Sequence, residues 1–369
     1  MQKSFICPRC FKKIQFTEVA YICTNTNANV NCQNAAERKL LYASQTTKGK
    51  CNHCGSVLSM VCPNCQYMVP DSLRKTESYP IAIIGAKEAG KSNYVAVLID
   101  QLKNKISGSF GFSMRAGDEN TIRRYGSDFR DPLFKRRVCL QGTDAGAVDP
   151  LIYIMEFDKK KKLFGKKEKD INLTFFDTAG ENLDSKTMME EHNRYLSYSS
   201  AIMLLLDPLQ IMAVREKLNG KIKLPDIRTD VEDIVERVIH IVEKERKKNK
   251  KEKFDVNVAI VFTKIDAVDI LLEPSSCLKN DSSHISKGYF DKNDFDDESA
   301  EMKSLVSSWL GDSLCNNLER NFENVGYFGV SALGSVPEEG SNKIAKFRPF
   351  RVADPFLWLL ALDGRINSQ

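Results

Sequence analysis

The sequence lacks any apolar run long enough to cross a membrane. Its longest uninterrupted apolar stretches, such as 201–206 and 356–362, fall far short of the roughly 18 to 20 residues that a bilayer-spanning helix needs. The first residues also lack an apolar stretch of signal-peptide length. We therefore expect a cytoplasmic protein with no transmembrane segment.

Cysteine is scarce over most of the 369 residues and concentrated at one end. Eight of the 11 cysteines lie within the first 65 residues, and the others are Cys139, Cys277 and Cys315. Clustered cysteines in a chain without a secretion signal favour metal binding over disulfides. The remaining composition, with 42% hydrophobic and 28% charged residues, is that of an ordinary globular protein.

Charge of one sign is not dominant, since the formal net charge is only +5. The excess is uneven, because residues 1–79 hold 10 Lys and Arg against 4 Asp and Glu. Two lysine-rich stretches follow at 159–169 and 245–253. We interpret these stretches as solvated loops or helix ends, with contacts to nucleic acid or acidic lipid as the alternative.

The cysteines form three C-x-x-C pairs with two single cysteines between them. A C-x-x-C turn sets two thiolates on one side of a backbone knuckle, as tetrahedral Zn²⁺ requires. Eight thiolates would fill two closed, structural sites, and spacing leaves both sequential and crossed groupings open. His53 lies inside such a turn and is expected to be a bystander. The expected zinc ligands are Cys7, Cys10, Cys23, Cys32, Cys51, Cys54, Cys62 and Cys65.

The order of apolar patterns predicts three parts: a metal-binding module at 1–70, a linker at 71–78 and an α/β domain at 79–369. Apolar runs predict strands at 80–84, 151–157, 171–176, 201–206, 256–263 and 326–331, and helical spacing predicts helices at 91–106, 226–248, 300–322 and 354–362. This alternation predicts a mostly parallel sheet with helices on both faces and one hairpin. Residues 107–150 and 272–299 are expected to be insertions or loops.

One segment fits the phosphate-loop pattern G-x-x-x-x-G-K-[ST] between a predicted strand and a predicted helix. Its glycines let backbone N–H groups surround an anion at a helix N-terminus. Lys91 would reach the β- and γ-phosphates, and the Ser92 hydroxyl would ligate Mg²⁺. The expected phosphate-binding residues are Gly85, Ala86, Lys87, Glu88, Ala89, Gly90, Lys91, Ser92 and the adjacent Asn93.

Three further segments end predicted strands in an order that favours guanine over adenine. Asp177 is expected in the Mg²⁺ shell, and Gly180 would offer its N–H to a γ-phosphate. The Asp266 carboxylate, in the segment Thr263, Lys264, Ile265, Asp266, can accept two hydrogen bonds from guanine N1–H and its amine, and Lys264 would pack over the base. The last segment is Ser331, Ala332 and Leu333, whose Ala332 N–H would meet the guanine carbonyl.

These motifs together resemble the Ras-like, translation-factor-related (TRAFAC) class of P-loop GTPases over residues 79–333. The resemblance implies GTP/GDP and Mg²⁺ as cofactors. The fourth motif has Thr263 where many relatives have Asn. For the switch threonine that coordinates Mg²⁺ in the triphosphate state we choose Thr143, and Thr121 is the competitor.

The position after the Asp-Thr-Ala-Gly motif departs from the Ras pattern, because Glu181 stands where Gln orients the attacking water. A carboxylate lacks the amide donor and adds charge near the γ-phosphate, so slow intrinsic hydrolysis is expected. Arginines in 107–150 could supply an arginine finger, and Lys87 is expected to face solvent. The residues expected to act in hydrolysis are Lys91, Thr143, Gly180 and Glu181.

The whole arrangement also resembles a bacterial double-GTPase type with N-terminal zinc ribbons, found in conflict or defence systems. The matching residues are Cys7–Phe11, Cys23–Asn25, Cys51–Gly55, Cys62–Cys65 and the tail that begins at Asp354. This resemblance implies a nucleotide-dependent regulatory switch that hydrolyses GTP and binds protein partners through the zinc module or switch loops. Two alternatives stay open: a nucleic-acid-associated GTPase that uses the basic module, and a GTP-binding scaffold with little hydrolysis.

Overall fold

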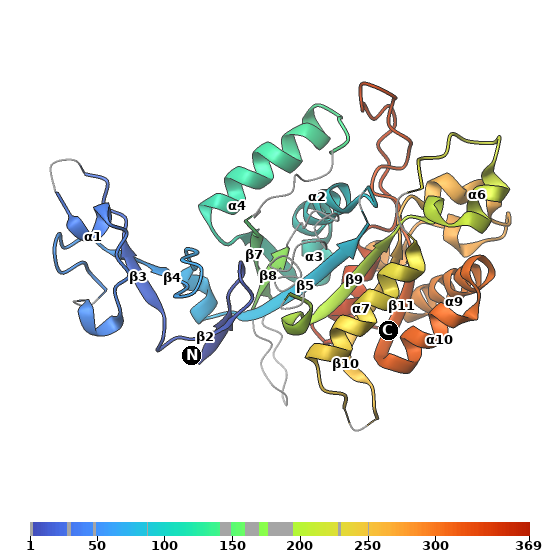
Figure 1. The fold of residues 1–369 in the computed structure, drawn as a ribbon. Helices are drawn as coiled ribbons and strands as arrows, with labels where there is room; N and C mark the ends of the chain where they lie inside the picture. The colour runs from blue at the N-terminus through green and yellow to red at the C-terminus, as the bar shows by residue number, and fades with distance from the viewer. Residues whose placement is uncertain are drawn as a thin grey trace.

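The central feature of the computed structural model is a seven-stranded sheet (Figure 1). The structure describes residues 3–27, 31–46, 49–86, 88–140, 149–158, 170–175, 195–227, 230–249 and 251–369. The strand order is β11-β10-β9-β5-β8-β7-β6. In chain order the strands are β5 (Glu77–Gly85), β6 (Phe112–Ala116), β7 (Leu151–Phe157), β8 (Ile171–Phe175), β9 (Ala201–Leu206), β10 (Phe254–Phe262) and β11 (Phe322–Gly329).

Five neighbouring strands of this sheet run parallel, and β7 and β6 complete it in antiparallel pairs. The mostly parallel α/β fold with one hairpin, β7–β8, is therefore confirmed. The central strand β5 has its later neighbours in the chain on both sides, β8 on one and β9 on the other. This is a topological switch point, where ligands of open α/β sheets bind beyond the carboxyl ends of the strands.

Helices cover both faces of the sheet and bury two separate apolar clusters, because successive strand residues point to opposite faces. Ile83 of β5 belongs to one cluster and the adjacent Ala82 to the other. The first face is covered by α2 (Lys91–Gln101), the π-helical η3 (Leu102–Ile106) and η4 (Tyr125–Lys135), and α11 (Asp354–Leu362). The second is covered by α6 (Met212–Leu218), α7 (Val231–Glu245), α9 (Lys292–Leu310) and α10 (Asp312–Asn321).

One expectation about local structure is wrong, and two segments contain more structure than their weak patterns indicated. The helix expected at 300–322 is two helices, since Gly311 has a φ of +78° and breaks the pattern. Residues 107–150, expected to be an insertion or a loop, contain α3 (Ser107–Phe110), β6, α4 (Glu119–Arg124) and η4. Residues 272–299 contain η8 (Cys277–Lys279), α8 (Ser283–Lys287) and the first turns of α9. Short elements and π-helical turns give too little periodicity to detect by pattern.

The cysteine-rich module extends from the sheet at the N-terminal end of the chain (Figure 1). It consists of two small antiparallel pairs, β1 with β2 and β3 with β4. Its elements are β1 (Ser4–Ile6), β2 (Lys13–Gln15), β3 (Ala20–Cys23), α1 (Gln33–Ala36), η1 (Ala43–Gln45) and β4 (Leu58–Val61), followed by η2 (Asp71–Arg74).

Among the described residues, no helix has both the length and the apolar character that crossing a bilayer requires.

Candidate functional site

The phosphate loop lies between the end of β5 and the start of α2, as expected from its sequence. Lys91 is buried, and its Nζ donates hydrogen bonds of 2.8 Å to the carbonyls of both Gly85 and Ala86. A Cβ at Gly85 would lie 2.5 Å from the carbonyl oxygen of Leu205, so only glycine fits beside β9. The loop therefore places a lysine and the N-terminus of an eleven-residue helix at one point, which is an anion site.

The predicted guanine motif meets this loop although it lies more than 170 residues later in the chain. Thr263, directly after β10, is buried, and its Oγ1 donates to the carbonyl of Ala89 at 3.0 Å. Lys264 Nζ donates to the carbonyl of Glu88 at 3.0 Å. The fold thus joins the two motifs through backbone carbonyls of the phosphate loop itself.

Asp207 completes this junction and is a residue that the sequence analysis missed. Its Oδ2 lies 2.6 Å from Lys264 Nζ, and its Oδ1 accepts a hydrogen bond from the N–H of Leu209. Only 4% of Asp207 is exposed, so the carboxylate neutralises the lysine at a desolvated position. The available signal was its place directly after a fully apolar strand, at the edge where ligands bind.

Asp266 lies in η7 (Ile265–Leu271) and is half-buried. Among the described residues its carboxylate has no hydrogen-bond or ion-pair partner. The two carboxylate oxygens, near the phosphate loop, can accept hydrogen bonds from two neighbouring N–H donors on one edge of a base. Guanine offers such a pair at N1 and the exocyclic amine.

The segment Ser331–Leu333 is held by a returning strand-like segment. The N–H of Ser331 donates to the carbonyl of Phe350 at 3.0 Å, and the N–H of Phe350 donates back at 2.8 Å. Leu333 accepts from the N–H of Arg348, whereas the N–H of Ala332 has no backbone partner within the described ranges. The N–H of Leu333 likewise has no backbone partner among the described residues, so both Ala332 and Leu333 have donors available for contact with a guanine carbonyl.

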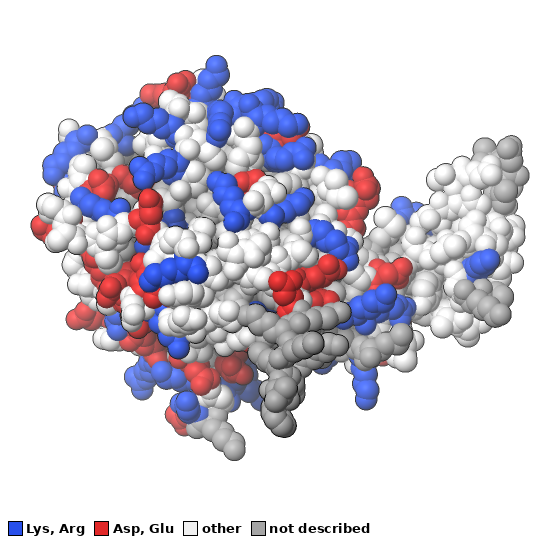
Figure 2. Space-filling view, turned by 180° about the vertical axis from the view of Figure 1, so that it is seen from behind, with Lys and Arg blue, Asp and Glu red and all other residues white. Residues whose placement is uncertain are grey.

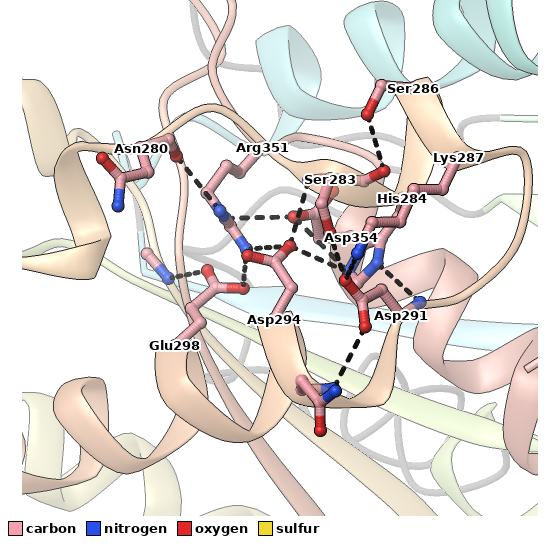
Figure 3. Close-up of polar contacts among 12 residues, drawn as sticks. Asn280, Ser283, His284, Ser286, Lys287, Asp291, Asp294, Glu298, Arg351 and Asp354 are labelled. Atoms are coloured by element: carbon pink, nitrogen blue, oxygen red, sulfur yellow. Dashed lines mark hydrogen bonds and ion pairs between the residues drawn. The ribbon is translucent and has the colours of Figure 1, made fainter. Parts of the chain in front are cut away.

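A buried ion network holds the end of β11 just before that segment and the residue that follows Phe350 (Figure 3). Glu298 of α9 accepts from the N–H of Gly329 at 3.1 Å and also binds Arg351, which follows Phe350, at 3.1 Å. Arg351 Nε lies 3.0 Å from Asp354 Oδ2, and its Nη2 lies 2.8 Å from Asp294 Oδ2. The Glu298 and Arg351 side chains are each 1% exposed. The sequence analysis missed this network because it expected only an insertion or a loop at 272–299.

The network contains a histidine and two aspartates, yet its proton arrangement disfavours a metal site. The N–H of Asp291 donates to His284 Nδ1 at 3.0 Å, so the neutral ring carries its proton on Nε2. That nitrogen faces Asp294 Oδ2 at 3.7 Å and Asp354 Oδ2 at 3.9 Å. A metal at Nε2 would require that proton to leave and Nδ1 to gain one, which would break the hydrogen bond that Nδ1 accepts from the N–H of Asp291, and Arg351 already pairs with both carboxylates.

The network makes stability depend on pH above neutrality. Burial raises the pKa of Glu298 to about 8 and that of Asp354 to about 7, although Arg351 opposes the shift. Burial lowers the pKa of His284 to about 4. Between about pH 6.5 and 8 the folded carboxyls hold more protons than unfolded ones. The folded histidine is neutral throughout this window, whereas the unfolded histidine, with a pKa of about 6.5, loses its proton over the lower half of the window and contributes the opposite slope there.

We therefore predict that these carboxyls lower the free energy of unfolding as the pH rises from 6.5 to 8. Asp354→Asn removes one titrating group, so its decrease should be smaller than that of the wild type. Urea unfolding at both pH values measures the two decreases, and groups outside the network cancel in the comparison. Equal decreases in both proteins would contradict the assignment.

Other site residues expected from the sequence have mixed outcomes. The Asn93 side chain binds Leu140 on both sides, with its Oδ1 accepting at 3.0 Å and its Nδ2 donating at 3.2 Å. Ser92 lies partly exposed in the first turn of α2. Thr121 is fully buried and its hydroxyl accepts from the N–H of Ile152, so it does not face a metal ion. Lys87, Thr143, Asp177, Gly180 and Glu181 lie outside the described residues.

Three of the arginines of 107–150 have partners close to them on the surface. Arg115 binds Glu156 at 3.0 Å, and Arg130 binds Asp131 at the same distance. Arg124 lies against Asp128 and donates to the carbonyl of Asp149. These guanidinium groups are occupied by neighbours on the same surface, as basic surface residues usually are.

The cysteines form two tetrads, and the grouping is crossed rather than sequential. Sulfur–sulfur distances are 3.7 Å for Cys7 to Cys65 and 3.5 Å for Cys23 to Cys54. Four sulfurs around one Zn²⁺ lie about 3.8 Å apart, whereas a disulfide needs roughly 2 Å. The tetrads are Cys7, Cys10, Cys62 and Cys65, and Cys23, Cys32, Cys51 and Cys54.

Local hydrogen bonds prepare the second tetrad for a cation. The hydroxyl and N–H of Ser56 lower the pKa of Cys54 to about 5, which favours the thiolate that Zn²⁺ binds. Asn34 Nδ2 donates to Cys51 Sγ at 3.4 Å. Both tetrads fit closed zinc sites, in which no ligand position remains for a substrate.

We predict two zinc ions per purified chain. Cys62→Ser should lower the content to one, since it removes a ligand from the first tetrad alone, and Cys315→Ser is a control at a buried cysteine far from both tetrads. Elemental analysis of dialysed protein measures the content. Two ions in Cys62→Ser would show that the assigned tetrad is wrong.

Comparisons with known proteins agree with this geometry. The model of the family described as Double-GTPase 2 matches residues 79–310, which include the phosphate loop and the Thr263–Asp266 segment. The chain is 23% identical over 325 residues to SaeC of Mycolicibacterium smegmatis, whose description proposes ESX-1 scaffolding and assembly. The match covers 82% of this chain and 80% of that protein.

Two solved structures are similar at low sequence identity. The Arl6 BBS3 small GTPase from Trypanosoma brucei with bound GppNp is 12% identical, covers 79% of this chain and 99% of its own, and gives a TM-score of 0.31. The G domain of the T. maritima FeoB iron transporter is also 12% identical, covers 69% and 89%, and gives a TM-score of 0.27. We base no argument on likenesses of this size.

Proposed function

The chain belongs to the Double-GTPase 2 family and is a GTP-binding protein, and from this premise we propose that it hydrolyses GTP as a regulatory switch. The observation that carries the proposal is the junction at the carboxyl edge of β5. There Thr263 and Lys264 bind two carbonyls of the phosphate loop, so the residues for the base and for the phosphates form one unit.

Each part of the reaction has a candidate residue. Lys91 and the N-terminus of α2 would stabilise charge on the γ-phosphate, and Ser92 with Asp177 and Thr143 would hold Mg²⁺. Mg²⁺ would neutralise the charge that develops on the transferred phosphoryl group. Glu181 would place the attacking water without an amide donor, so the rate without a partner should be low. Asp177, Thr143 and Glu181 lie outside the described residues, and their roles rest on the sequence.

The partners of the switch are proposed to be proteins. Both tetrads are closed, so the zinc module would serve as a docking unit with no chemistry of its own. The description of SaeC as a scaffolding and assembly protein supports a role in assembly. A place in a bacterial defence system is the second, more specific proposal, and it rests on the sequence resemblance.

Figure 2 does not favour the nucleic-acid alternative. On the face drawn, Lys and Arg side chains spread over the main body with Asp and Glu among them, and the protruding cysteine-rich module carries few charged side chains. A nucleic-acid surface would gather its cations along one stripe or patch.

Single-turnover hydrolysis separates a switch from a scaffold. With enzyme in excess over radiolabelled GTP and Mg²⁺, the switch proposal predicts phosphate release faster than from GTP in buffer, and Lys91→Ala should return the rate to that background. Binding of GTP with release no faster than the background would leave only the scaffold function.

A further inference from the structure

The first cysteine knuckle contacts the nucleotide-binding domain directly. Phe11, which follows Cys10, is 1% exposed and belongs to the apolar cluster on the α7 face of the sheet, not to the core of its own module. Its ring lies 4.7 Å from the ring of Tyr195. The Tyr195 hydroxyl donates to the carbonyl of Ile81 and accepts from the N–H of Ile83, both in β5, the strand that leads into the phosphate loop.

The backbone of Phe11 shows that its side chain is not required to form the knuckle. The residue after the second cysteine is left-handed in all three C-x-x-C knuckles, with φ of +55° at Phe11, +74° at Gly55 and +56° at Gln66. Gly55 has no side chain, and Gln66 points to solvent. A large side chain is disfavoured in this conformation. Phe11 alone of the three is buried, and it is buried against the other domain.

A second set of contacts joins the first tetrad to residues at and before β7. Arg9 Nε lies 3.7 Å from Asp149 Oδ1, and the Tyr67 hydroxyl donates to Asp118 Oδ2 at 3.3 Å. Ile152 of β7 packs into the apolar cluster that contains Cys7, Cys10 and Cys62. The knuckles of the first tetrad therefore contact the domain at two separate places.

In sequence, Asp149 follows Thr143 by 6 residues and Tyr195 follows Glu181 by 14, and these are the motifs that the sequence assigns to γ-phosphate sensing. The second tetrad differs, since its apolar cluster contains residues of the cysteine module alone. Among the described residues, it is thus the first tetrad whose neighbours contact Tyr195 and, through it, β5, the strand that leads into the phosphate loop.

We propose that the first zinc knuckle is an internal effector whose docking on the domain, through Phe11 and Arg9, is tighter in the GTP-bound state. This inference rests on the proposed function and names the partner that its switch acts on first, which is the chain's own N-terminal module. Coupling between two sites is reciprocal. Docking of the knuckle must then raise the affinity for GTP relative to GDP by the same factor by which GTP tightens docking.

The test measures the affinity of the full chain for GDP and for a non-hydrolysable GTP analogue in wild type, Phe11→Ala and Phe16→Ala. Phe16 is the matched control, because its ring packs on Phe5 and Arg74 within the module and its linker. We expect Phe11→Ala to weaken analogue binding about tenfold, the size of a lost aromatic contact, and GDP binding less than threefold. Phe16→Ala should change neither. Phe11→Leu, which keeps an apolar side chain, should recover part of the loss.

Hydrogen exchange on the wild type tests the same coupling without any variant. The analogue should protect amides in 3–16 relative to GDP and leave those in 49–58, at the second tetrad, unchanged. The effector role would be overturned if Phe11→Ala weakened binding of GDP and of the analogue equally. It would also be overturned if the amides of 3–16 exchanged equally fast with either nucleotide bound. Failure of the wild type to bind guanine nucleotides at all would instead refute the proposed function.

Discussion

Asp266→Ala is expected to lower the affinity for GTP by on the order of a hundredfold or more, while the weak affinity for ATP stays unchanged. A carboxylate that accepts two hydrogen bonds contributes roughly 1.5–3 kcal/mol for each, and alanine removes both. Adenine has no matching donor pair, so ATP loses nothing. Isothermal titration with GTP and ATP in the presence of Mg²⁺ measures both affinities.

The matched control for this substitution is Asp269→Ala. Asp269 lies three residues later in the same short helix and is exposed, with only a surface ion pair to Lys279. Its substitution should leave both affinities within about twofold, as surface pairs usually do. Unchanged GTP preference in Asp266→Ala would mean that the base is recognised elsewhere.

Lys91→Ala is expected to weaken GTP and GDP binding by a similar order, for a different physical reason. In the structure the ammonium group holds the carbonyls of Gly85 and Ala86. A bound nucleotide would add phosphate oxygens as charge-assisted acceptors of the same group. Alanine removes this charge and also the two bonds that shape the loop, so the loss should exceed that of a single hydrogen bond.

Lys103→Ala provides the control, since Lys103 lies in η3 directly after α2 and is exposed. Displacement of a fluorescent GDP derivative measures each protein's affinity, and thermal unfolding checks that the fold is intact. If an intact Lys91→Ala variant bound both nucleotides as tightly as the wild type, the predicted phosphate loop would not be the phosphate-binding site.

Local patterns predicted the sheet and the phosphate loop well, because their signals are contiguous in sequence. The strands 151–157 and 201–206 and the helix 354–362 have the predicted bounds, since long apolar runs fix them. The sequence placed the Thr263–Asp266 segment at the carboxyl edge of the sheet, where ligand sites gather, and the contact of Thr263 with Ala89 agrees with that placement.

Other parts of the site could not be predicted from one sequence. Asp207 and Lys264 are 57 residues apart, and no periodicity relates them. The Glu298–Arg351 pair depends on how α9 crosses the end of β11. The predicted pattern divided α9 between a segment expected to be an insertion or a loop, 272–299, and a helix expected from residue 300. The crossed grouping of cysteines depends on β3 pairing with β4, a register that knuckle spacing does not encode.

The most direct test of the guanine site is an exchange of base specificity in Asp266→Asn. An amide offers one acceptor and one donor, which suits xanthine, because xanthine has a carbonyl where guanine has its exocyclic amine. The account predicts that this variant binds xanthosine triphosphate more tightly than GTP, the reverse of the wild type, as measured by competition against fluorescent nucleotide. Because misfolding cannot create a new preference, a reversal would support the guanine site directly. A folded Asp266→Asn variant that still prefers GTP over xanthosine triphosphate would contradict the assignment of Asp266 to the base.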